Sequence, residues 1–87
     1  MSQELLVKSL DLLSAGNLRP GPEMNEAHEI CQDHEGSAPF DWIHALVHRI
    51  EGDDANAGYW YRRAGKDRHS GSIQEEWQII RTDVERN

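Results

Sequence analysis

The sequence predicts an all-α fold. Apolar residues recur at the three- and four-residue spacing of helices in almost every segment of the 87-residue chain. No stretch shows the sustained alternation of apolar and polar residues, rich in β-branched side chains, that marks strands. Proline, glycine and capping residues divide the chain into four or five helices around a central antiparallel hairpin, and residues 1–87 are expected to form one domain.

The first helix is expected from about residue 2 to residue 15. Leu6 and Leu10 share one of its faces, and Gly16 offers a left-handed C-terminal cap. Residues 17–22 then hold two prolines around a glycine, which removes backbone donors and disfavours helix. This segment is therefore expected to be a loop.

Pro22 suits a first helical position, so the second helix is expected to run through Glu35 and to end near Gly36. Its apolar side carries Met24, Ala27, His28 and Cys31. A single cysteine cannot make an internal disulfide, and Cys31 is expected to be a buried, inert thiol.

A tight helical hairpin is expected in the middle of the chain. Ser37 can cap a third helix that Gly52 closes, and Asp53 or Asp54 can cap a fourth that ends near Gly65. The packing positions are Ile43, Leu46, Val47 and Ile50 in the third helix and Ala57, Trp60, Tyr61 and Ala64 in the fourth.

The last helix is expected to follow a polar turn. Ser72 and Glu75 have the spacing of a capping box, which marks its start. Its apolar stripe consists of Ile73, Trp77, Ile80 and Val84. We expect Trp77 and Ile80 to dock this helix onto the central hairpin.

Composition and charge exclude several classes of function. The formal net charge of −7 argues against nucleic acid as the main partner, because phosphate binding draws on concentrated Lys and Arg. No apolar run is long enough to cross a membrane. Glu4, Lys8 and Asp11 interrupt the first leucines, unlike the apolar centre of a signal peptide, so a cytoplasmic protein is expected.

The charge is unevenly distributed. Residues 23–35 carry five acidic side chains and no Lys or Arg, whereas residues 62–68 carry four cations against Asp67 alone. Tyr59 lies next to this basic segment, and an exposed aromatic among arginines is a common composition of protein interfaces. A protein partner or self-association is therefore expected to use Tyr59, Arg62 and Arg63.

The sharpest chemical pattern is a polar stripe on the third helix. Its members, spaced three, four and three residues apart, are Asp41, His44, His48 and Glu51. Two histidines at i and i+4 can ligate one metal ion, as in His-Glu-x-x-His helices. Ala45 stands where that motif has its catalytic Glu, so a zinc protease is excluded.

Three interpretations of this stripe remain open. In the first, His44 and His48 are structural histidines held by carboxylates or tyrosines; in the second they bind a small ligand together with Glu51, Asn56 and Arg63; in the third they bind a transition metal. His28 and His34 can join a metal cluster only if the second helix packs beside the third, and both are expected to be ordinary, partly exposed histidines. We assign no metal or cofactor and no catalytic residue from the sequence.

Residues 51–64, EGDDANAGYWYRRA, resemble the turn and second helix of a tetratricopeptide or Sel1-like repeat. Those repeats place a small residue, an aromatic and a second small residue where this chain has Ala57, Tyr61 and Ala64. The preceding helix departs from the repeat, since only Ala45 fits its pattern. The resemblance implies a helical hairpin and not a peptide-binding solenoid, which needs several stacked repeats.

A longer pattern resembles a group of small uncharacterised helical proteins from bacteria and fungi. It consists of HALVHRIEGD at residues 44–53, NA at residues 56–57 and YWYRRAG at residues 59–65. This resemblance implies no activity. The expected function is a small protein-interaction or structural domain without catalysis, and the alternative is a small-ligand or transition-metal site on His44 and His48. The candidate binding residues are His44, His48, Glu51, Asn56, Tyr59, Arg62 and Arg63.

Overall fold

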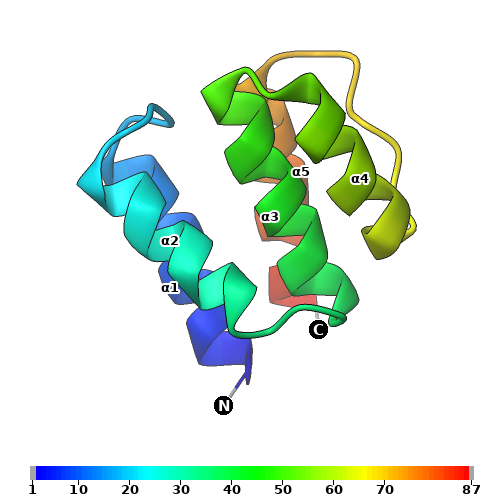
Figure 1. Ribbon diagram of the computed structural model, residues 1–87. Helices are drawn as coiled ribbons and strands as arrows, with labels where there is room; N and C mark the ends of the chain where they lie inside the picture. The colour runs from blue at the N-terminus through cyan, green and yellow to red at the C-terminus, as the bar shows by residue number, and fades with distance from the viewer. Residues whose placement is uncertain (1, 87) are drawn as a thin grey trace.

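The computed structural model describes residues 2–86 and confirms the all-α prediction (Figure 1). Its helices are α1 (Ser2–Ala15), α2 (Pro22–Gln32), α3 (Ala38–Glu51), α4 (Asp54–Ala64) and α5 (Ile73–Arg86). No strand occurs in this part of the chain. None of the described helices combines the length and the apolar character needed to span a membrane.

Helix α3 lies at the centre of the molecule. The α1–α2 hairpin flanks it on one side, α4 packs antiparallel to it on the other, and α5 lies behind it (Figure 1). Residues 40–48 of α3 are consequently buried without interruption, polar side chains included. The sequence predicted one buried apolar face for this helix. The structure buries more of it than that face, because other helices cover all its sides.

Helices α3 and α4 form the expected tight hairpin. Gly52 ends α3 with φ 81° and Gly65 ends α4 with φ 70°, so both glycines occupy the left-handed region predicted for them. The Asp53 carboxylate caps α4 by accepting from the Asn56 amide at 3.2 Å. Ala57 and Ala64 are both buried on the packing face, where small side chains let the two helices approach closely.

Helix α1 spans residues 2–15 as predicted, but its predicted cap and the predicted end of α2 are wrong. Gly16 does not cap α1; the left-handed residues are Asn17 (φ 61°) and Leu18 (φ 55°). Leu18 packs partly buried against the core and donates its amide to the Leu13 carbonyl at 2.9 Å, and this contact outweighs the usual preference for glycine. Helix α2 ends at Gln32 instead of continuing to Glu35, and residues 33–36 form turns.

The start of α3 depends on Asp41. Its two carboxylate oxygens accept from the Gly36 amide, each at 3.2 Å, and its side chain is buried. Ser37 precedes the helix as predicted, but its side chain makes no capping bond. Asp41 therefore joins the α2–α3 turn to α3. Although it shares the polar stripe with His44 and His48, it is not among the residues whose ligand atoms converge.

Helix α5 begins with the predicted capping box, since the Glu75 amide donates to Ser72 Oγ at 3.0 Å and the Ser72 amide donates to Glu75 Oε1 at 2.8 Å. Ile80 and Val84 are buried as expected. Trp77, expected on the hairpin, instead donates its indole N–H to the Leu10 carbonyl of α1 at 2.9 Å. The helix thus joins α1 to α3, since it packs against both.

A buried polar network that the sequence did not reveal fastens α5 to the hairpin. Glu76 is 1% exposed and accepts from the Tyr61 hydroxyl at 2.6 Å and from Arg49 Nη1 at 2.6 Å. Arg49 also donates to the Gly71 carbonyl. Burial and the bond to Glu76 raise the pKa of Tyr61, so the phenol remains a donor at physiological pH.

The Tyr61→Phe substitution is expected to destabilise the fold by about 1–3 kcal/mol, because it leaves a buried carboxylate short of a donor without changing the shape of the ring. Tyr59→Phe is the matched control, since the Tyr59 hydroxyl bonds only at the surface. Urea unfolding of both variants measures the difference. Equal stabilities would show that the Glu76 network contributes nothing specific.

Candidate functional site

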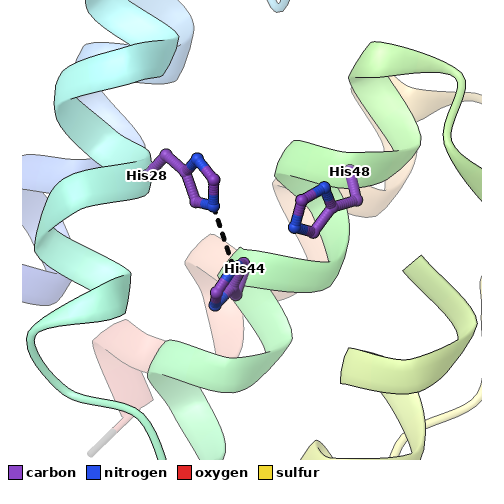
Figure 2. A group of neighbouring side chains, drawn as sticks. All are labelled: His28, His44 and His48. Carbon is purple, nitrogen blue, oxygen red and sulfur yellow. Dashed lines mark hydrogen bonds between the residues drawn. The ribbon is translucent and has the colours of Figure 1, made fainter. Parts of the chain in front are cut away.

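Three histidines meet between α2 and α3 (Figure 2). His28 comes from α2, while His44 and His48 lie one turn apart on α3. One ring nitrogen from each residue lies within 4.8 Å of the other two. The Nε2 atoms of His28 and His44 are 3.0 Å apart and share a hydrogen bond. We call this group the histidine cluster.

His28 is partly exposed as expected, but it is not an ordinary histidine, because it belongs to the histidine cluster. Met24, Ala27 and Cys31 pack the inner side of α2 against the core, and His28 follows Ala27 on that side. Helix α2 therefore packs beside α3, which is the arrangement that His28 needs in order to join a metal cluster with His44 and His48. His34 stays apart, with its ring stacked on Phe40 at a centroid distance of 4.2 Å.

Neighbouring groups orient the two histidines of α3. His48 Nδ1 donates a hydrogen bond to Glu51 Oε1 at 2.8 Å, since a carboxylate can only accept. The His44 ring stacks on Trp60 with centroids 3.8 Å apart and planes 16° from parallel. His44 and His48 are 1% and 7% exposed, and these contacts hold both rings within the fold.

The electrostatics of the histidine cluster favour the neutral forms of His28 and His44. Burial, together with the charges of His28, His48 and Arg63, lowers the pKa of His44 to about 3. Burial, followed by the charge of His48, also lowers the pKa of His28. Neutral rings retain lone pairs at neutral pH, which is the form that ligates metal ions.

His44 also holds a polar atom without a partner. Its Nδ1 atom is buried and makes no hydrogen bond within the described residues. Its Nε2 atom bonds only to His28, so just one of the two ring nitrogens has a hydrogen-bond partner. Leaving such a group unpaired costs free energy, so His44 is poorly explained by a purely structural role.

The remaining candidate residues lie on α4 and divide into two groups. Asn56 is exposed and donates from Nδ2 to the Asp53 carboxylate at 2.9 Å, which gives it a role in capping α4. Arg63 donates to the Tyr59 hydroxyl at 3.0 Å, and its guanidinium lies 5.1 Å from the Trp60 ring centroid.

A surface aromatic accompanies these cations. Tyr59 is 44% exposed, and Arg62 and Arg63 are exposed beside it. Trp42, from the first turns of α3, is covered by the Lys66 ammonium 4.5 Å above its ring. We call Tyr59, Arg62, Arg63 and Lys66 the basic surface; Trp60 connects it to the histidine cluster, since it contacts both Arg63 and His44.

Cys31 is buried and free, as the sequence predicts. Burial, with a smaller effect of Asp41, raises the pKa of its thiol to about 12. The thiol is therefore protonated at physiological pH and unsuited to act as a nucleophile.

Comparisons with protein-family models, with curated proteins and with solved structures find no match to this chain.

The depressed pKa of His44 predicts loss of stability in acid. As the pH falls from 6.5 toward about 3, the unfolded state binds a proton at this histidine that the folded state does not, so stability declines through that window. His44→Gln removes this contribution and is expected to flatten the pH dependence of the unfolding free energy. Urea unfolding across the window tests this, with His69→Gln, in the loop before α5, as the control. A parallel slope in all three proteins would contradict the assignment to His44.

Proposed function

We propose that this protein is a transition-metal-binding domain whose ligands are His28, His44 and His48. The observation that carries the proposal is the convergence of three imidazoles from two helices, with one nitrogen of each within 4.8 Å of the others. Imidazole nitrogen suits zinc, copper and nickel and is not a preferred ligand of magnesium or calcium. Zn²⁺ is the metal we expect, because it accepts three histidines in a flexible geometry.

The distances support this choice. Zinc–nitrogen bonds of about 2.0–2.1 Å in a tetrahedron put neighbouring ligand nitrogens about 3.3 Å apart. The His28 and His44 Nε2 atoms, at 3.0 Å, already lie near this separation. Binding would draw the remaining nitrogen inward by on the order of 1 Å, a shift that side-chain rotation can supply.

Outer contacts also fit a metal ligand set. A histidine that ligates through one nitrogen usually donates its other N–H to a carboxylate or carbonyl, and His48 makes such a contact with Glu51. Trp60 covers the His44 ring and limits its rotation. The ligands join α2 to α3, so bound metal would tie the α1–α2 hairpin to the centre of the fold.

Zinc is therefore expected to raise the stability of the purified protein. A site present only in the folded chain stabilises by about 2.7 kcal/mol when free metal is 100 times its Kd, and a chelator reverses the gain. His28→Gln should abolish the zinc-dependent rise in Tm; this half-buried position favours folding of the variant. His34→Gln, outside the histidine cluster, is the matched control. A parent Tm that neither zinc nor chelator changes would contradict metal binding.

A second candidate function, protein interaction, is favoured by the basic surface. Tyr59 is exposed beneath an arginine in a chain of net charge −7, and residues 23–35 offer an acidic counterpart on a second copy of the protein. Helices α2 and α4 flank opposite sides of α3, so one copy can present both surfaces at once (Figure 1). The free thiol of Cys31 suits a reducing compartment such as the cytoplasm.

Self-association through these surfaces is expected to be strongest at low salt, where opposite charges are least screened. Arg63→Glu should weaken this self-association. Arg19→Glu, in the loop after α1, changes the net charge by the same amount outside the basic surface and should leave the self-association unchanged. Sedimentation at two salt concentrations measures the oligomeric state. A parent protein that remains monomeric in both would remove the support for this second function.

A further inference from the structure

We propose that metal held by the histidine cluster keeps an open coordination position that takes a small monovalent anion. This inference rests on the metal-binding function proposed above and adds to it the chemical class of a ligand. It concerns the fourth position of a tetrahedral ion, which decides whether a zinc site is structural or reactive. Structural sites fill that position with a protein side chain, whereas reactive sites leave it to water or substrate.

The histidine cluster supplies three ligands. Among residues 2–86, no fourth Cys, His, Asp or Glu belongs to the group of converging ligand atoms. A tetrahedral ion at this place would therefore have one position without a protein ligand.

The nearest other donors are already engaged. Glu51 binds the Nδ1 side of His48, where it orients the ring. Both oxygens of Asp41 accept from the Gly36 amide. Cys31 follows His28 by one helical turn, but its thiol is fully buried and protonated and lies outside the group. None of these side chains can close the coordination sphere without giving up its present environment.

Solvent can reach the histidine cluster from α2. His44 and His48 are buried, whereas His28 is only half-buried, so the cluster meets the surface at His28. Figure 2 shows the His28 ring extending from α2 across the gap toward the two rings of α3. An exchangeable ligand would enter along this side.

Charge selects the kind of ligand. A divalent ion with three neutral imidazoles keeps a charge of about +2, and Arg63 adds a cation whose field reaches His44. This combination favours an anion. Glu29, Glu35 and Glu51 act on His28 with the opposite sign. They oppose multivalent anions most, so a small monovalent anion such as hydroxide, formate or azide fits better than sulfate or phosphate.

Cobalt substitution tests the proposal directly, because the visible spectrum of Co²⁺ reports its coordination. The full chain is titrated first with Co²⁺ alone, then with azide, and in parallel with sulfate. We expect a four-coordinate spectrum that azide shifts saturably and sulfate does not. Arg63→Gln should weaken azide binding roughly fivefold while Co²⁺ still saturates the site. Arg19→Gln, the charge-matched control, should leave the azide titration unchanged.

The possible outcomes distinguish failure of the open coordination position from failure of metal binding itself. Absence of Co²⁺ binding in the first titration would overturn both. A Co²⁺ spectrum that azide leaves unchanged would overturn the open position and leave metal binding intact. Equal effects of sulfate and azide, or no effect of Arg63→Gln, would overturn the selection of a small monovalent anion by charge.

Discussion

The burial of α3 on all sides is the constraint on which the rest of the structure depends. A helix in that position cannot turn residues 40–48 to water, so its polar side chains depend on partners within the protein. Asp41 finds the backbone of the turn after α2, His44 finds His28, and Arg49 finds Glu76 of α5. These contacts determine which helix or turn packs on each side of α3. Apolar packing alone would not distinguish these arrangements as sharply.

The helices could be predicted because their signals are local. Apolar spacing, Gly52, Gly65 and the Ser72–Glu75 box act within one or two turns, and the chain follows them. The wrong cap of α1 and the wrong end of α2 have a different origin. Leu18 is held left-handed by its contact with the core. Helix α2 stops at Gln32, and the turns after it lead to Gly36, whose amide bonds to Asp41 of α3. Both contacts lie beyond the helix whose end was predicted, so the pattern within that helix does not carry them.

The same distinction explains how much of the site was predictable. His44 and His48 share a face through helical geometry, so their pairing follows from spacing alone. His28 is sixteen residues before His44, and Glu76 is twenty-seven residues after Arg49, so each contact depends on how separate helices pack. Asn56 was grouped with the histidines because of its place in the chain, yet one turn of α4 directs it to Asp53.

The attachment of α5 has a consequence for the order of folding. Helices α1 to α4 pack mainly against their neighbours in the chain, whereas α5 returns to α1, where Trp77 bonds to Leu10 across 67 residues. Contacts of such long range require the closure of a large loop and tend to form late. Before that closure Arg49 and Tyr61 remain hydrated. The arrival of Glu76 then removes water from three polar groups in one step, which makes the final assembly all-or-none and leaves little room for a stable intermediate with α5 half attached.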